Sequence, residues 1–240
     1  MTLAAVPDHA ADPARRLADL MDATSPATRA HQAHSGTLPV LEPLRPLVPG
    51  GGLARGTVTE VGDASLLLAI AAGSAIADPC AWTAAVGLPD LGLAAAAGYG
   101  LDLRRFLVAD DPGQHIVEVV TALAAACPVV LAAAPAHLPP RTLDRLAAHL
   151  RRTGTVLITP GPWPGARLYL EVTAGRWSGL GDGWGQLTGR RVTVTVTGRG
   201  SAVRARSAEL WLPDANGGVS SVAGVSAGAA PETVSAAVSV

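Results

Sequence analysis

Short apolar stretches alternate with helix-like stretches between residues 57 and 159. Five brief stretches, rich in Val, Ala, Leu or Thr, predict strands at residues 57–61, 80–86, 105–109, 128–133 and 155–159. Between them, four stretches with apolar residues at helical spacing predict helices at residues 65–76, 91–99, 115–126 and 140–152. Strands that alternate with helices in this way are typical of a parallel sheet covered on both faces. The pattern therefore predicts an α/β fold with a mostly parallel sheet flanked by helices.

After residue 160 the pattern changes to strict alternation of apolar and polar side chains. Residues 167–172, 190–196 and 208–212 show this period of two and are joined by Gly-rich stretches. Alternation with turn-forming residues between the segments favours antiparallel strands with one face on the core. We therefore expect a C-terminal antiparallel hairpin extension of the parallel sheet.

The two ends of the chain differ from the middle in composition. We expect an N-terminal arm with a short helix at residues 1–34, a core at 35–213 and a disordered Ala/Ser/Gly/Val tail at 214–240. The Pro- and Gly-rich start of the core, residues 35–55, predicts an extended connection that ends in a tight turn.

Composition narrows the chemistry that the chain can perform. With 49% hydrophobic and 15% charged residues, the chain can bury a sizeable core, which excludes a wholly disordered protein. The 18 basic and 19 acidic residues nearly cancel, so no overall field draws the protein to nucleic acid or anionic lipid. All the basic residues are Arg, which excludes a lysine Schiff base and a phosphate-binding lysine. The expected core includes Leu67, Leu68, Val129, Val130 and Leu131.

Few residues are candidates for metal or redox chemistry. Cys80 and Cys127 stand alone, and the absence of a secretory leader predicts a cytoplasmic protein with reduced thiols. His31 and His34 are three residues apart but have no third ligand near them, so no metal site is predicted. The uncharged stretch 119–136 is interrupted by proline, and no membrane segment is predicted. We expect no cofactor.

Five short motifs occur in the order found in the RecA recombinase core. The segment 51–61, Gly-Gly-Leu-Ala-Arg-Gly-Thr-Val-Thr-Glu-Val, resembles the entry to the RecA ATP-binding loop. Residues 99–107 are similar to the RecA segment that joins a helix to a strand, and residues 165–172 resemble a later strand. Residues 191–194 and 208–211 are similar to the RecA C-terminal hairpin. The resemblance covers about residues 45–213 and implies a RecA-like fold.

The chain departs from RecA at the residues that handle ATP. A phosphate-binding loop uses backbone N–H groups, a Lys and a Ser or Thr, whereas here Gly62-Asp63-Ala64-Ser65 passes directly into the helix. Ser65 is expected to start that helix rather than to bind a metal. The expected acids after the second strand and at the end of strand 128–133 are also missing. Because phosphoryl transfer depends on these groups together, we expect no enzyme activity and neither binding nor hydrolysis of ATP.

The DNA-binding loops of RecA are also reduced. Their positions correspond to residues 134–139 and 160–165, which are short, rich in proline and free of Arg. Trp163 lies in the second loop and is expected to fill a Pro-rich turn rather than to stack on a base. We therefore expect direct DNA binding to be weak or absent.

A RecA-like core without these parts is similar to the ImuA/ImuA-prime family of damage-induced mutagenesis factors, which is related to SulA. This resemblance implies a non-catalytic accessory factor of error-prone translesion synthesis. Its implied partner is an ImuB-type inactive Y-family polymerase homologue and, through it, an error-prone C-family polymerase and the sliding clamp, with RecA as a further candidate. The implied location is the cytoplasm, with association to the nucleoid on DNA damage. Two alternatives stay open: a SulA-like inhibitor of the tubulin-like division protein, and a working ATPase or recombinase.

The predicted hairpin carries the candidate partner-binding residues. They are two tryptophans and five arginines, and the arginines are not interspersed with acidic residues. Trp and Arg are common anchors of protein interfaces. The set comprises Trp177, Trp184, Arg190, Arg191, Arg199, Arg204 and Arg206. Trp211, in an alternating strand, is expected to pack in the core instead.

Overall fold

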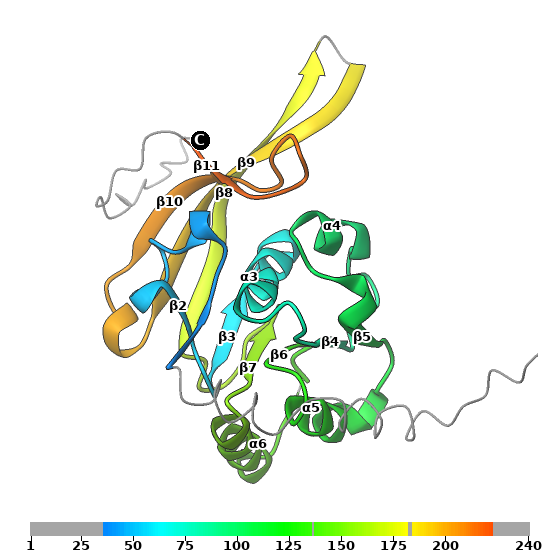
Figure 1. Cartoon of the computed structure of the whole chain (residues 1–240). Coiled ribbons are helices and arrows are strands. Elements are labelled where there is room, and N and C mark those ends of the chain that lie inside the picture. The colour runs from blue at the N-terminus through cyan, green and yellow to red at the C-terminus, as the bar shows by residue number, and fades with distance from the viewer. Residues whose placement is uncertain (1–35, 136, 182–183, 223–240) are drawn as a thin grey trace, which may run out of the picture.

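The computed structural model describes residues 36–135, 137–181 and 184–222 and contains a sheet of nine strands (Figure 1). The order of the strands in space is β11-β10-β9-β8-β3-β7-β6-β4-β5. Six neighbouring strands are parallel to one another: β8 (Leu168–Gly181), β3 (Val58–Val61), β7 (Val156–Thr159), β6 (Val129–Ala132), β4 (Thr83–Val86) and β5 (Phe106–Ala109). The predicted mostly parallel sheet is therefore confirmed.

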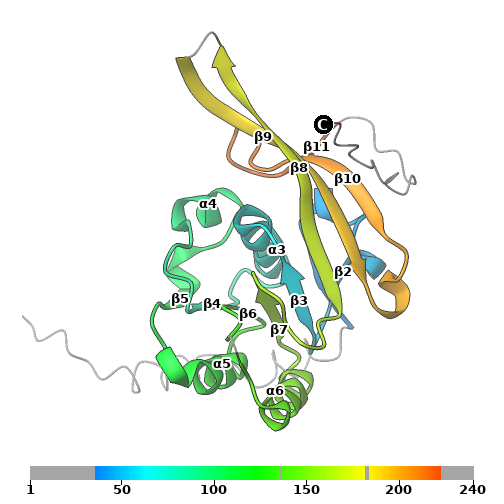
Figure 2. The ribbon, with the colours of Figure 1, turned by 180° about the vertical axis from the view of Figure 1, so that it is seen from behind.

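Helices cover both faces of the parallel strands (Figures 1 and 2). Helices α3 (Ala64–Ala77) and α4 (Leu93–Gly98) pack on one face, and α5 (Ile116–Ala124) and α6 (Pro140–Thr153) pack on the other. The four helices begin and end within a few residues of the predicted limits. α6 ends at Gly154, whose positive φ of 72° closes the helix after Arg151 and Arg152.

The core lies between these layers, and the predicted core residues are all in it. Leu67 and Leu68 of α3 are buried, as are Val129, Val130 and Leu131 of β6. The strand β6 is buried along its whole length because it has a neighbour on either side and helices over both faces. Among the described residues no helix is long and apolar enough to span a membrane.

The segment before β3 is a packed layer rather than the extended connection that its composition predicted. It contains a small antiparallel pair, β1 (Thr37–Pro39) and β2 (Gly52–Ala54), which covers the outer side of α3. Leu38, Leu44 and Leu53 of this segment are fully buried. A Cβ on Gly73 of α3 would lie 2.1 Å from the carbonyl oxygen of Pro39, so only glycine permits this close approach. The layer explains why α3 is apolar on every side.

The antiparallel strands after residue 167 are longer than predicted. β8 pairs with β9 (Trp184–Gly198), which pairs with β10 (Arg206–Trp211). The far half of the β8–β9 hairpin, residues 177–181 and 184–187, extends beyond the helices and the other strands (Figures 1 and 2). We call this projecting part the β-arm.

The prediction of a disordered tail from Asp214 is wrong for residues 214–222. The Asp214 carboxylate accepts hydrogen bonds from the backbone N–H groups of Asn216 and Gly218 and so closes a turn. β11 (Ser220–Ser221) then adds a further antiparallel strand to β10. These backbone hydrogen bonds order a stretch with little apolar surface of its own. Residues 223–240, like the predicted arm at 1–34 with its helix, lie outside the described residues.

Candidate functional site

The amino-terminal end of α3 is the place where the resemblance to RecA would put the phosphates of ATP. It lies directly after β3, where the loop between strand and helix is only two residues long. The first turn of a helix has free N–H groups and a partial positive charge, so it attracts an anion. Here the anion is supplied by the chain itself. The Asp63 carboxylate accepts a hydrogen bond of 3.0 Å from the backbone N–H of Leu66.

Arg190 of β9 neutralises the second oxygen of this carboxylate. Its Nη1 lies 2.8 Å from Asp63 Oδ2, and the two side chains are only 20% and 16% exposed. The pair joins residues 127 positions apart in the sequence. Arg190 is therefore paired within the chain, and its role in a partner-binding surface stays a prediction.

Tyr99 completes the filling of this end of α3. Tyr99 is 5% exposed, and its phenol lies close to the Ser65 hydroxyl. Burial raises the pKa of Tyr99, and its phenol lies within the electrostatic influence of Asp63, Arg190 and Asp214. Ser65 thus lies in the first turn of α3 beside Tyr99, but Asp63, and not the predicted Ser65, caps the helix. The side chains of Asp63, Ser65, Tyr99 and Arg190 thus lie together where the resemblance to RecA would put the phosphates.

The ends of β6 and β4 carry no buried acid. β6 consists of four apolar residues, and Asp90, after β4, is exposed. Glu60 of β3 has a carboxylate that accepts a hydrogen bond of 3.2 Å from the backbone N–H of Trp163. Glu60 thus anchors the connection between β7 and β8.

That connection, residues 160–167, passes over β3 on the side of α6. Trp163 is 7% exposed and packs with Val58 and Leu157, which confirms that it fills a turn. A cavity of about 540 Å³ lies beside it, lined by three prolines, Leu138, Trp163, Tyr169 and Glu60. Its single charged lining residue is the acid Glu60, which would repel a phosphate.

The β-arm carries the largest exposed aromatic side chains of the described residues. Trp177 is 50% exposed and Trp184 is 82% exposed. Leu180 and Leu187 are also exposed, so four large apolar side chains project within eleven positions. Such a cluster on a projecting hairpin is a feature of interaction sites, because it costs solubility unless a partner covers it.

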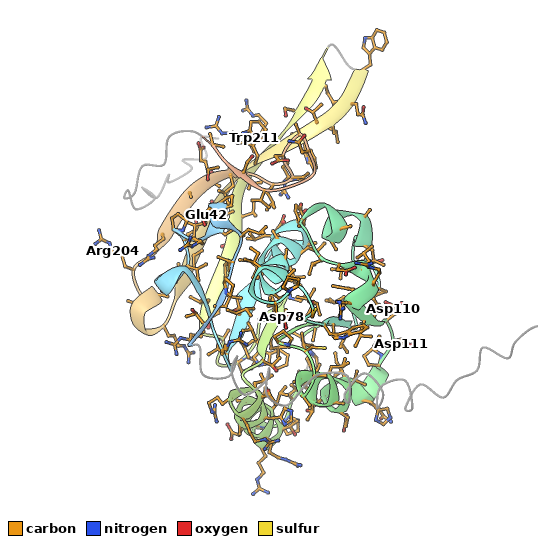
Figure 3. The ribbon with its side chains drawn as sticks, in the orientation of Figure 1. Glu42, Asp78, Asp110, Asp111, Arg204 and Trp211 are labelled. Carbon is orange, nitrogen blue, oxygen red and sulfur yellow. The ribbon has the colours of Figure 1, made fainter. Side chains whose placement is uncertain are left out.

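The structure does not bring the seven predicted partner-binding residues together. Only Trp177 and Trp184 lie on the β-arm. Arg191 forms an ion pair with Glu209 across β9 and β10, and Arg199 lies at the opposite end of β9 from the tip. Arg204 points away from the sheet, whereas Trp211, which is partly buried, lies near the base of the arm (Figure 3). Arg206 donates a hydrogen bond of 3.3 Å to the backbone carbonyl of Pro46.

No metal or thiol chemistry is indicated in the part of the chain that the structure describes. No group of three or more His, Cys, Asp or Glu side chains gathers there in a way that could hold a metal ion. Cys127 is buried, which raises the pKa of its thiol to about 12, so it stays protonated and unreactive at neutral pH.

Comparison with known proteins places the chain in a family. The profile of the family described as MT3502 N-terminal domain matches residues 46–165, which is half of the 240 residues. The chain belongs to this MT3502 family. The uncharacterized protein Rv3395c of Mycobacterium tuberculosis is 35% identical to it over 165 residues, which cover 64% of this chain and 80% of that protein.

A solved structure supports the fold of this MT3502-family member. The RadB recombinase aligns with a TM-score of 0.52 at 14% sequence identity, over 75% of this chain and 97% of that one. At this identity the likeness concerns the fold alone. Together with the order of the strands, it confirms the RecA-like α/β fold predicted from the sequence.

Proposed function

We propose that this chain is a non-catalytic RecA-like accessory factor of error-prone translesion DNA synthesis, which acts by binding an ImuB-type inactive Y-family polymerase homologue. The observation that carries the proposal is the Asp63–Arg190 pair at the amino-terminal end of α3. If the position that would bind the nucleotide is filled by the protein's own side chains, the protein acts by binding a partner and not by catalysing a reaction.

The chemistry of phosphoryl transfer explains why this position supports no catalysis. The reaction needs cations and N–H donors around the phosphates, a metal ion and a group that orients the nucleophile. The Asp63 carboxylate would repel a phosphate at the N–H group that it occupies, and Arg190 is bound to Asp63. The chain has no Lys to replace Arg190. We therefore propose that ATP neither binds at α3 nor is hydrolysed.

The β-arm is the surface that we assign to the partner. Trp177 and Trp184 are aromatic side chains of the kind that often dominate the binding energy of interfaces, with losses of roughly 2 kcal/mol or more on truncation. The hairpin presents them away from the body of the protein, where a partner can reach both faces (Figures 1 and 2). Through the ImuB-type partner the chain would join a C-family polymerase and the sliding clamp at damaged DNA.

The test is co-purification of an ImuB-type homologue with the wild-type chain and with Trp177→Ala/Trp184→Ala. Each truncation at a central anchor corresponds to a loss of tenfold or more in affinity, so the double variant should lose most of the captured partner. Its thermal unfolding should be unchanged, since both side chains are exposed.

Two control variants accompany this test. Val203→Ser alters an apolar side chain that is 73% exposed but lies outside the β-arm, and it should bind like the wild type. Deletion of 223–240 removes a stretch without Arg or aromatic residues and should also be neutral. Wild-type binding by the arm variant would refute the assignment of the surface. Capture of the tubulin-like division protein in place of the ImuB-type homologue would refute the proposed function.

A further inference from the structure

A basic cavity lies at the amino-terminal ends of the parallel strands, on the side of α6. Its volume is about 470 Å³, and four arginines line it: Arg55, Arg151, Arg167 and Arg199. The β-arm projects from the opposite end of the molecule, and α6 lies far from it in both views (Figures 1 and 2). The cavity is therefore distinct from the surface that we assign to the protein partner.

Backbone contacts fix the four arginines around the cavity. Gly56 turns the chain into β3 with a φ of 71°, and a Cβ there would lie 2.7 Å from Cα of Arg151, so this turn packs directly on the end of α6. The backbone N–H of Arg167 donates to the carbonyl of Val58, and that of Arg199 donates to the carbonyl of Arg167. Neighbouring strands and a helix end thus hold the cavity in place.

The positive charge of the cavity is not balanced by the described part of the chain. No Asp or Glu lines it, and none of the four arginines forms an ion pair with a described residue. The Nε atom of Arg55 is buried without a hydrogen-bond partner, and burial lowers the pKa of this side chain. Because Arg55 is partly desolvated and has no counter-charge among the described residues, an anion in the cavity would stabilise it.

The chemistry of the lining selects the anion. Guanidinium groups form paired hydrogen bonds to carboxylates and phosphates, but four of them in one small space match a group that carries two or more charges on adjacent oxygens. No aromatic ring lines the cavity, so a nucleobase would find no stacking surface. The volume falls in the range of small-molecule sites, roughly 300–1,000 Å³, and is too small to enclose a duplex.

We propose that this basic cavity binds a phosphate monoester or diphosphate group. Such a group can belong to a small phosphorylated molecule or to the phosphorylated end of a nucleic-acid strand, and both present the same oxygens to the four arginines. The assignment does not depend on the proposed function, and its test needs no partner protein.

The test is a calorimetric titration of the full chain with inorganic pyrophosphate at constant ionic strength. The wild type should bind one equivalent. Arg151→Ala and Arg199→Ala, whose side chains are exposed at the rim, should fold normally and weaken binding about tenfold each, the loss expected for a charged hydrogen-bonding partner. The matched control is Arg204→Ala, which removes the same charge outside the cavity and should bind like the wild type.

Oligonucleotides identify the source of the phosphate group. If a 5′-phosphorylated single strand binds at least tenfold more tightly than its unphosphorylated twin, the natural ligand is a strand end. If pyrophosphate binds and the two strands bind equally weakly, it is a small molecule.

Three results would overturn the proposal. The first is the absence of pyrophosphate binding, and the second is an equal loss in Arg204→Ala, which would indicate unspecific charge attraction. The third is tighter binding of a polyglutamate peptide or of the unphosphorylated strand than of pyrophosphate, which would assign the cavity to an acidic protein segment or to a nucleic-acid backbone.

Discussion

A chain carrying Val130→Asp should not accumulate as soluble, folded protein. Val130 lies in the middle of β6, fully buried between β4 and β7 and packed against the helices of the α6 face. A carboxylate at this place has no cation to pair with and must either lose its hydration or take up a proton. The cost is several kcal/mol, comparable with the whole stability of a domain, about 5–15 kcal/mol.

The matched control is Val108→Asp in the edge strand β5 of the same sheet. Val108 is 46% exposed, so its replacement keeps the new carboxylate in water and should leave soluble expression intact. The comparison requires soluble yield and thermal melting of both variants. A Val130→Asp protein that is soluble and melts cooperatively would contradict the position of β6 at the centre of the sheet.

The second large effect is expected at the pair between Asp63 and Arg190. Asp63→Ala removes the cap of α3, worth about 1 kcal/mol, and leaves the partly buried Arg190 guanidinium without its counter-charge, worth about 2 kcal/mol more. Asp63→Asn keeps a side-chain oxygen that can cap the helix, so it should lower the free energy of unfolding by less. If the double variant Asp63→Ala/Arg190→Met loses less stability than the sum of the single changes, the two residues are coupled.

Urea unfolding of the four proteins of this cycle measures the coupling, which we expect to be about 1–3 kcal/mol. The exposed pair between Arg191 of β9 and Glu209 of β10 serves as the control. Because water screens it, its coupling should stay below about 1 kcal/mol. Additive effects at Asp63 and Arg190 would show that the pair does not hold β9 to the start of α3.

The strands and helices between residues 57 and 159 could be predicted because the local spacing of their apolar residues indicates which positions are buried. β6 is apolar at every position and β7 at all but its last, Thr159, as is typical of strands covered on both faces. α6 has its buried Leu146 and Leu150 at helical spacing. In contrast, the prolines and glycines at residues 35–55 indicated an extended connection, although apolar side chains of this segment, such as Leu44 and Leu47, are buried in the core.

For the candidate site, the sequence predicts only which residue types are missing, and not which side chains take their place. The missing lysine and acids are visible in the sequence, whereas the pair that replaces them is not, since Asp63 and Arg190 meet only through the fold. The same is true of Tyr99 beside Ser65. Arginine residues scattered from 55 to 199 likewise show no pattern in sequence, although the fold gathers four of them around one cavity. Glycines within β8 and β9 concealed the length of the hairpin, because they are typical of turns.

The most direct test of the account is the release of phosphate from Mg·ATP by the purified full chain, with and without single-stranded DNA. Because Asp63, Arg190 and Tyr99 fill the end of α3, we expect no release above that of a protein-free solution. Binding of phosphate groups in the basic cavity would not alter this result, since no acid lines it to orient a nucleophile. A rate that saturates with ATP, rises with DNA and disappears in Ser65→Ala would contradict the account, because Ser65 would then serve a nucleotide instead of Tyr99.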